Sequence, residues 1–531
     1  MKRSLSLLLL VCMLLATASV LSACQGPAGP VGPGGGVDVE FIDHLDEYGD
    51  SMDFSGQQEF VISFYDLYDY EVYGEEKSNE KLDTLIYNRN KLLEKRFGLE
   101  ISQSGKIQSS GANDTDSHYT YVQGALNSGD ASFDAIAMYA YQAGKLILGN
   151  GGNFLDWRSE VPYCKDSIAK GEEWWPTEIN IDSTVMGKQF VAVSDFSITA
   201  MEMTYAVIFN KDLAKKTNVA NTYDPAKYTI DSTLYDMVRA NDWTLETMKT
   251  IVKGYWRDNP TSGKAGERDV EDRFGMVGVG TTDGDAWAYA LGFNYIINDG
   301  VSYPEVWEWS DKQFDAIGSL RELYESDGTW KQPVGQILGD YNARAAFFAQ
   351  EDRVLFQLNT LESLKWDVIH NMEQDFGVLP YPKYDKNQPK HLTGSLDHYS
   401  VLAVPYTTAW NSERLRMTGA LIEALSAENC NSVKDPYYDD IVTHHNVTDG
   451  DSVEMINIIM DGRVYDLGMY HYNELVLDPT DQYDGAFALF FRYLIRNPGK
   501  DIVNYWQSNS GNLDGQMSSL MSRYNAILGG Y

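Results

Sequence analysis

The sequence has few cysteines, few basic residues relative to acidic ones, and no long apolar run beyond its first residues. Only 4 of the 531 residues are cysteine, so neither a disulfide framework nor a Cys-rich metal scaffold is expected. The chain contains 42 Lys and Arg and 77 Asp and Glu, which gives a formal charge of −35. Such a surface repels phosphate backbones, which excludes nucleic acid as the expected partner.

Motifs for common catalytic and metal sites are also missing. There is no Gly-x-Ser-x-Gly nucleophile elbow, no P-loop and no Rossmann glycine pattern. The 8 His are scattered without a metal-ligand spacing, and no calcium-loop pattern occurs. We therefore expect no metal and no cofactor.

What the sequence does contain is an ordinary globular composition that is rich in aromatic residues. Hydrophobic residues make up 43% and aromatic residues 13%, with 35 Tyr and 12 Trp. A chain of this length exceeds what one hydrophobic core supports, so more than one domain-sized unit is expected.

The first 36 residues predict an export signal and an anchor. Lys2 and Arg3 precede an apolar stretch over 5–15, which is shorter than the ~20 residues that span a bilayer. Leu21-Ser22-Ala23-Cys24 resembles the bacterial lipobox, which implies removal of residues 1–23 and acylation of Cys24, for example with palmitate. The alternative is an ordinary signal peptide that contains a Cys. Residues 24–36 are rich in Gly and Pro and predict a tether.

Two further cysteines, Cys164 and Cys430, would remain in the mature protein. In an exported protein they could form a disulfide, while two buried free thiols are an equally good interpretation.

Hydrophobic periodicity predicts alternating strands and helices. Apolar runs at 59–64, 99–101 and 133–138 indicate strands, and the helical spacing over 81–97 and 119–126 indicates helices between them. This alternation predicts a parallel α/β sheet. Further strands are expected at 189–193, 205–209, 378–381 and 400–404, and helices are expected after Thr244, after Ser310 and over 412–427. The last hundred residues are expected to be mainly helical.

Five segments occur in an order that resembles the extracellular solute-binding proteins of bacterial ABC importers, the group similar to maltose-binding protein. They are Phe133–Met138 with Gly149–Trp157, Tyr205–Leu213, Asn241–Lys249, Phe274–Met276 and Phe376–Pro382. The resemblance implies a type II periplasmic-binding-protein-like fold of two α/β lobes joined by crossing strands. Lobe one is expected over 37–195 and 376–430, and lobe two over 196–375 and 431–531.

The same resemblance implies a function. The protein is expected to be a monomeric, extracytoplasmic lipoprotein without enzymatic activity. It would capture a small polar solute between the lobes and deliver it to an ABC permease, and the favoured solute is a mono- or oligosaccharide. Two alternatives remain: a secreted glycoside hydrolase, and a ligand-sensing or adhesion lipoprotein on the same fold. Peptides and polyols stay open as ligands.

Candidate ligand-binding residues follow the ends of the predicted strands. Sugars present C–H faces that pack on aromatic rings and hydroxyls that bind carboxylates and amides, and ligands lie beyond the carboxyl ends of parallel strands. On this basis the candidates are Asp66, Tyr139, Tyr141, Asp195, Trp287, Tyr289, Glu362, Trp366, Asp397 and His398.

A sharper hypothesis concerns two of these loops. Tyr139 and Tyr141 would approach Trp287 and Tyr289 from opposite lobes and enclose a sugar ring. For each candidate taken singly, core packing or a solvated surface is the alternative.

Overall fold

The computed structural model describes residues 44–49, 51–78, 80–103, 115–259, 268–269, 271–278, 284–330, 341–444, 447–481 and 485–529. The chain divides into two units, Met1–His44 and Leu45–Tyr531, and the sheets and helices below belong to the second unit. The predicted signal sequence, Cys24 and the tether lie outside the described residues.

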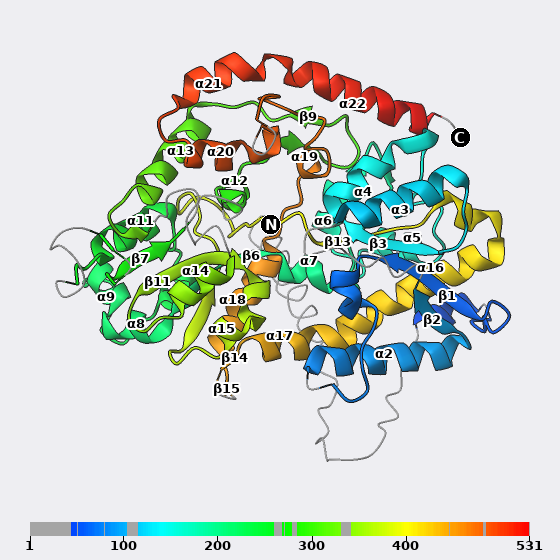
Figure 1. Cartoon of the computed structure of the whole chain (residues 1–531), viewed down its shortest axis with the longest axis horizontal. Helices are drawn as coiled ribbons and strands as arrows, with labels where there is room; N and C mark the ends of the chain where they lie inside the picture. The colour runs from blue at the N-terminus through cyan, green and yellow to red at the C-terminus, as the bar shows by residue number, and fades with distance from the viewer. Residues whose placement is uncertain are drawn as a thin grey trace, which may run out of the picture. The chain divides into compact units, whose positions relative to one another are not determined.

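The first sheet has four strands in the order β13-β3-β1-β2 (Figure 1). The strands are β1 (Glu59–Phe64), β2 (Glu100–Gln103), β3 (Ala135–Tyr139) and β13 (Ser400–Ala403). β1 pairs in parallel with both β2 and β3, and the chain crosses between them through α2 (Lys81–Phe97) and α3 (Thr115–Ser128). The predicted parallel α/β arrangement is therefore confirmed. β13 runs antiparallel to β3.

The second sheet has five strands in the order β10-β7-β11-β6-β12. The strands are β6 (Tyr205–Asn210), β7 (Phe274–Val277), β10 (Thr329–Trp330), β11 (Val354–Thr360) and β12 (Phe376–Leu379). β7 pairs in parallel with β10 and β11, whereas β6 runs antiparallel to its neighbours β11 and β12.

The second sheet corrects one expected boundary. Lobe one was expected to resume at residue 376, but β12 pairs with β6, with Phe376 opposite Asn210. The chain returns to the first sheet only with β13, where Ser400 lies opposite Tyr139. The reason is that an apolar run shows that a segment is a strand without showing which sheet accepts its hydrogen bonds.

Helices cover both sheets. Figure 1 shows α2 and α16 (Ser412–Glu428) on one side of the first sheet and α3 and α4 (Ala140–Ile147) on the other. The remaining α-helices are α5 (Cys164–Lys170), α6 (Thr177–Asp182), α7 (Ile198–Glu202), α8 (Lys211–Lys216), α9 (Val219–Tyr223), α10 (Leu234–Arg239), α11 (Leu245–Tyr255), α12 (Ala286–Ala290), α13 (Asp311–Tyr324), α14 (Tyr341–Phe348), α15 (Asp367–His370), α17 (Asp435–Ile441), α18 (Gly450–Asp461), α19 (Leu467–Tyr470), α20 (Phe490–Arg496), α21 (Ile502–Asn509) and α22 (Leu513–Leu528).

Short elements connect these helices and strands. They are the two-stranded sheets β4–β5 (Thr184–Val185, Lys188–Gln189), β8–β9 (Ile296–Ile297, Glu305–Val306) and β14–β15 (Thr443–His444, Val447–Thr448), and the helical turns η1 (His44–Tyr48), η2 (Asp66–Glu71), η3 (Gly149–Gly151), η6 (Leu361–Lys365), η7 (Tyr406–Trp410), η8 (Asn429–Lys434), η9 (Phe487–Leu489) and η10 (Ser510–Asn512).

Local sequence signals explain why several helices begin and end where they do. α2 ends at Gly98, whose φ of 69° is the left-handed conformation that glycine adopts without strain. α11 begins after Thr244, whose side chain accepts a hydrogen bond from the N–H of Thr247 (3.3 Å). Gln313 in α13 accepts a hydrogen bond from the N–H of Ser310 (3.0 Å), as the predicted capping box requires.

The apolar run at 189–193 is the exception among the predicted strands. Only Lys188–Gln189 is a strand, paired with β4, and Ala192 makes a single bridge to Leu402. Residues 190–193 are buried, so the run reflects core packing of the segment that crosses toward the second sheet.

α19 is packed closely against α4 in the first lobe. A Cβ atom added at Gly144 of α4 would lie 2.0 Å from the carbonyl oxygen of Tyr470, so only glycine allows this approach. The close contact fixes the position of the chain that follows α19.

Cys164 and Cys430 are both free and buried, so the structure selects two thiols over a disulfide. In the part of the chain that the structure describes, no helix has both the length and the apolar character needed to cross a membrane.

Candidate functional site

Two loops meet at the carboxyl end of the first sheet. Tyr139 ends β3 and lies opposite Ser400, the first residue of antiparallel β13. The N–H of Ala140 donates to the carbonyl of Tyr399 (3.1 Å), so Asp397 and His398, just before β13, lie at the same edge as Tyr139. This is the edge at which ligands of parallel sheets bind.

Aromatic rings from these loops and from the segment after α19 form a continuous group, which we call the tyrosine cluster: Tyr65, Tyr68, Tyr139, Tyr141, His398 and Tyr472. The rings of Tyr68 and Tyr139 have centroids 5.3 Å apart. His398 stacks on Tyr139 at 4.9 Å, with 2° between the ring planes. Tyr141 lies 6.2 Å from His398 and 5.9 Å from Tyr472. The group therefore extends from the first sheet to the C-terminal region.

One end of the tyrosine cluster is buried and the other is open. Tyr65, Tyr68 and Tyr139 are buried, whereas Tyr141 and Tyr472 are half-buried. The His398 side chain is 42% exposed. A ligand would thus reach the cluster at its Tyr141–His398–Tyr472 end.

The second sheet brings charged groups to the cluster. β11 ends at Thr360 and is followed by η6, which carries Glu362 and Lys365. Thr360 lies opposite Tyr205, the first residue of β6, so Glu202 just before β6 lies at the same edge. Because β6 runs antiparallel to β11, Glu202 before β6 places its carboxylate at the carboxyl end of β11.

Glu202 joins the two sheets through a buried hydrogen-bond network. Its carboxylate accepts hydrogen bonds from the hydroxyls of Tyr70 in η2 and Tyr437 in α17. Lys365 Nζ lies 2.8 Å from Glu202 Oε1, and it also lies 4.5 Å from the centre of the Tyr70 ring. A buried carboxylate needs such partners, because an unpaired charge in the interior is costly.

Glu362 has a different environment. Burial raises the pKa of its carboxyl to about 6, with Glu202 adding to the rise and Lys365 opposing it. Among the described residues, none hydrogen-bonds to the Glu362 carboxylate. Its charge contributes to the raised pKa of Tyr68, which results mainly from burial, so that hydroxyl remains a donor at neutral pH.

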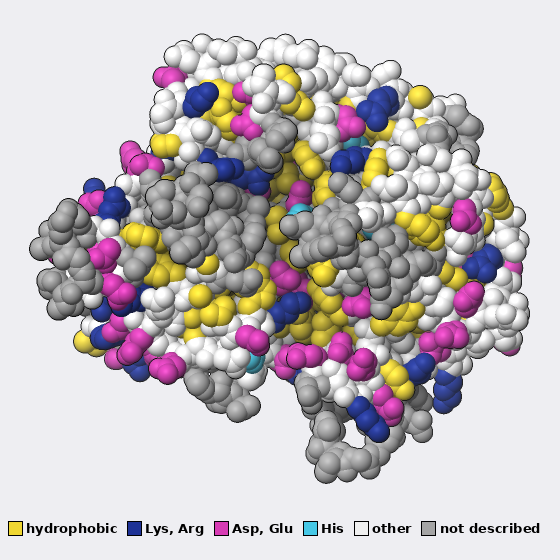
Figure 2. Space-filling model, in the orientation of Figure 1, with side chains coloured by type: hydrophobic (Ala, Val, Ile, Leu, Met, Phe, Trp, Pro, Cys, Tyr) yellow, Lys and Arg dark blue, Asp and Glu magenta, His cyan; other side chains and the backbone are white. Residues whose placement is uncertain are grey.

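The arrangement suits a polar ligand with flat apolar faces. The half-buried rings of Tyr141 and Tyr472 offer packing surface, although Lys145 Nζ lies 5.0 Å from the centre of the Tyr141 ring. The carboxylates of Glu362 and Asp397 can accept hydrogen bonds from hydroxyl or amino groups. Figure 2 shows a recessed area near the centre of one face, where hydrophobic side chains lie close to acidic and basic ones.

Five of the predicted site residues come together in this arrangement. They are Tyr139, Tyr141, Glu362, Asp397 and His398. Asp397 Oδ1 lies 3.6 Å from His398 Nε2, and the charge of Glu362 contributes to the raised pKa of Tyr139, which is due first to burial. Their role in ligand binding remains a prediction.

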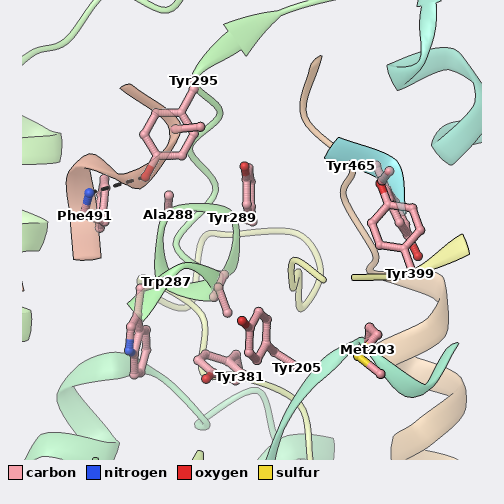
Figure 3. Packing of buried hydrophobic residues seen from close by; sticks show 14 of the residues in the cluster. Met203, Tyr205, Trp287, Ala288, Tyr289, Tyr295, Tyr381, Tyr399, Tyr465 and Phe491 are labelled. Carbon is pink, nitrogen blue, oxygen red and sulfur yellow. Dashed lines mark hydrogen bonds between the residues drawn. The ribbon is translucent and has the colours of Figure 1, made fainter. Parts of the chain in front are cut away.

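The predicted enclosure of a ring by Trp287 and Tyr289 does not fit the structure. Trp287 in α12 is 0% exposed, its indole N–H donates to the hydroxyl of Tyr324 (3.0 Å), and its ring packs on Tyr381 (4.9 Å). Figure 3 shows Trp287 and Tyr289 among other buried side chains. Packing of α12 among buried side chains such as Tyr324 and Tyr381 therefore explains both residues, in agreement with the core alternative.

Two other candidates, Asp195 and Trp366, lie outside the tyrosine cluster, and the side chain of a third, Asp66, is not described. Asp195 forms an ion pair with Lys434 (2.8 Å) and lines a separate small cavity of about 20 Å³. Trp366 is half-buried against a hydrophobic core. Asp66 begins η2, and its side chain lies outside the described part of the structure.

Glu202, Lys365, Tyr437 and Tyr472 were not predicted as site residues. Glu202 precedes an antiparallel strand, so the rule about carboxyl ends of parallel strands does not select it. Tyr437 and Tyr472 come from the C-terminal helical region, where the described strands β14 and β15 form a small sheet of their own and mark no edge of the two large sheets. For Lys365, the three-residue spacing from Glu362 on one helical turn is the only signal in the sequence.

A cavity of about 620 Å³ lies elsewhere. Phe209, Lys211 and Asp375 line it, at the opposite end of β6 from Tyr205. It is therefore distant along the strand from the edge that carries Glu202 and Glu362. In the described ranges no group of three or more His, Cys, Asp or Glu side chains is placed to hold a metal ion.

Comparison with known proteins gives the fold. No family model matches the sequence, and no curated protein matches it. Similar solved structures include a cyclo/maltodextrin-binding protein in complex with maltotetraose, with a TM-score of 0.52 and 10% identity, covering 87% of this chain and 97% of that one.

Two further structures have comparable scores. The galacto-N-biose/lacto-N-biose I-binding protein of a Bifidobacterium longum ABC transporter, in complex with lacto-N-biose, has a TM-score of 0.50 and 11% identity over 88% of this chain and 97% of its own. Apo RafE from Streptococcus pneumoniae has a TM-score of 0.50 and 14% identity over 88% and 99%. The chain thus has the type II periplasmic-binding-protein-like fold that the sequence resemblance implied.

Proposed function

We propose that the protein is the substrate-binding lipoprotein of an ABC importer and that it binds a carbohydrate at the tyrosine cluster. The observation that carries the proposal is the convergence of aromatic rings and carboxylates where the carboxyl ends of β1, β3 and β11 meet. Support also comes from the fold, which is shared with two proteins whose solved complexes contain maltotetraose and lacto-N-biose.

A thermal-shift screen against a panel of neutral sugars tests the proposal directly. A sugar present at 100 times its dissociation constant should raise the free energy of unfolding by ~2.7 kcal/mol. The matched control is the same panel with the Tyr141→Ala variant, which lacks an accessible ring of the cluster. A panel without any shift in the wild-type protein would contradict the proposal.

The anchor is tested separately. We propose that Cys24 is acylated after removal of residues 1–23 and holds the protein on the outer face of the membrane. Cys24→Ala should release the protein from the membrane fraction. Cys164→Ala, at a buried thiol of the folded body, should leave fractionation unchanged. Membrane association of Cys24→Ala equal to wild type would refute the lipobox interpretation.

Delivery to a permease follows from the anchor. The chain would hand its ligand to a membrane partner, so ligand-dependent capture of an ABC permease is the expected result. Binding to cells that ignores ligand would support the adhesion alternative.

The glycosidase alternative has one observation in its favour. The raised pKa of Glu362, about 6, is a property that general acids of glycosidases share. Steady release of reducing sugar from an oligosaccharide that binds would establish the enzyme. We expect stoichiometric binding without product.

A further inference from the structure

A cavity of about 280 Å³ begins where the tyrosine cluster ends. Tyr472, Asn473, Val476, Asp478 and Leu489 are among the residues that line it. These residues lie after α19 and as far as Leu489, the last residue of η9, in a part of the chain that none of the five segments of the sequence resemblance includes.

Tyr472 belongs to both the cavity and the tyrosine cluster. Its ring lies 5.9 Å from that of Tyr141, and the charge of Asp397 adds to the rise that burial causes in the pKa of its hydroxyl. Tyr472 follows α19, whose Tyr470 carbonyl approaches Gly144 of α4 too closely for any side chain to fit between them. The cavity is therefore continuous with the proposed binding surface at a defined ring.

The walls of the cavity carry the same chemistry as the cluster. Val476 and Leu489 are apolar, while Asn473 and Asp478 are polar. Asp478 accepts hydrogen bonds from the N–H and the hydroxyl of Thr480 (3.0 and 2.6 Å), and these hydrogen bonds lower its pKa. An ionised acceptor beside apolar side chains and a tyrosine ring suits the hydroxyls and C–H faces of a sugar.

The cavity is small. Its volume is near the lower limit of small-molecule sites, which occupy ~300–1,000 Å³. It therefore has room for about one ring and cannot contain a large ligand alone.

We propose that this cavity is a second subsite and that the ligand is an oligosaccharide, an inference that rests on the proposed function. One sugar unit would lie against Tyr141 and His398, and a following unit would lie beyond Tyr472 against Asn473 and Asp478.

Isothermal titration calorimetry with sugars of increasing length tests the second subsite. The probes are the malto-, cello- and α-galactoside series from one to four units, titrated into the purified full-length chain. In the series that binds, the affinity should increase at least tenfold from the shortest ligand that binds to a longer one. Pro479→Trp, at an exposed position on the cavity wall, should fill the cavity and remove that increase while leaving the affinity for the shortest ligand unchanged.

Ser518→Trp is the matched control, because Ser518 is exposed on α22 and is outside the cavity lining. It should bind every length as wild type does, and both variants should melt at the wild-type temperature. Wild-type binding that does not depend on ligand length, or a Pro479→Trp variant that retains the full increase, would overturn the second subsite alone. Absence of binding to every sugar in the wild type would overturn the proposed function and this inference together.

Discussion

At the scale of single residues, burial distinguishes the two roles considered for Trp287. Its side chain is 0% exposed, so Trp287→Ala should lower the free energy of unfolding by ~3–5 kcal/mol, as for other buried aromatic truncations. Trp410 is 65% exposed, and Trp410→Ala should change stability by less than ~0.5 kcal/mol. Chemical denaturation of both variants makes the comparison. Wild-type stability together with lost sugar affinity in Trp287→Ala would return this residue to the binding site.

Glu362 gives a pH dependence of stability. Its pKa is about 6 in the folded protein against an ordinary value of 4.5, so the folded state binds more protons than the unfolded state between these pH values. The free energy of unfolding should therefore fall as pH rises from about 4.5 to about 6, with a contribution of up to ~2 kcal/mol from this group.

The control for this pH dependence is Glu362→Gln, which cannot titrate. Other buried acids also titrate, for example Asp466 with a pKa raised to about 6 by burial, so the quantity to compare is the difference between variant and wild type across the window. The variant should gain stability relative to wild type as pH rises. Parallel pH profiles would show that the Glu362 carboxyl is not desolvated in the folded protein.

The predicted residues that come together at the sheet edge share one property. Tyr139, Asp397 and His398 lie next to the ends of the strands predicted at 133–138 and 400–404, and Glu362 follows the apolar run that forms β11, so their place at the sheet edge follows from the chain itself. Trp287 and Tyr289 lie in a short helix after β7, where sequence cannot distinguish a cleft from a core. The difference is decided by the packing of α12 on side chains such as Tyr381, far away in the sequence.

At the scale of secondary structure, two helical glycines offer a matched comparison. A Cβ at Gly144 in α4 would meet the carbonyl of Tyr470 at 2.0 Å, whereas a Cβ at Gly124 in α3 would meet nothing within 4 Å. Gly144→Ala should therefore destabilise the protein, because α19 must move off α4. Gly124→Ala should stabilise it by up to ~1 kcal/mol, since alanine is the better helix former. Thermal denaturation of the two variants makes the comparison, and equal stability would contradict the close packing of α19.

Most of the helices and strands near the N-terminus could be predicted because each has its own local signal. α2 combines helical periodicity with a glycine stop, and β1 is a continuous apolar run. The run at 189–193 has the same apolar signal, but only Gln189 belongs to a strand, and the rest of the run forms one bridge, from Ala192 to Leu402. Local sequence patterns do not show which strands pair when the strands are far apart in the sequence.

At the scale of the whole molecule, the sequence indicated two α/β sheets but not the exact point at which the chain crosses between them. β12 extends the second sheet through β6, and the return to the first sheet occurs over 380–399. The C-terminal region adds Tyr437 and Tyr472 to the groups at the two sheet edges. Because these residues come from helices and loops, their contribution depends on the complete fold.

The central claim is that the tyrosine cluster binds a carbohydrate, and calorimetric titration of one accessible ring tests it most directly. A sugar that binds the wild-type protein should bind Tyr141→Ala at least tenfold more weakly, because the variant loses both the stacking contribution of ~0.5–1.5 kcal/mol and the apolar area of the ring. Tyr303→Ala, at a 46% exposed tyrosine outside the cluster, should bind as wild type does. Equal affinity of the wild-type and Tyr141→Ala proteins for every sugar that binds would contradict the account.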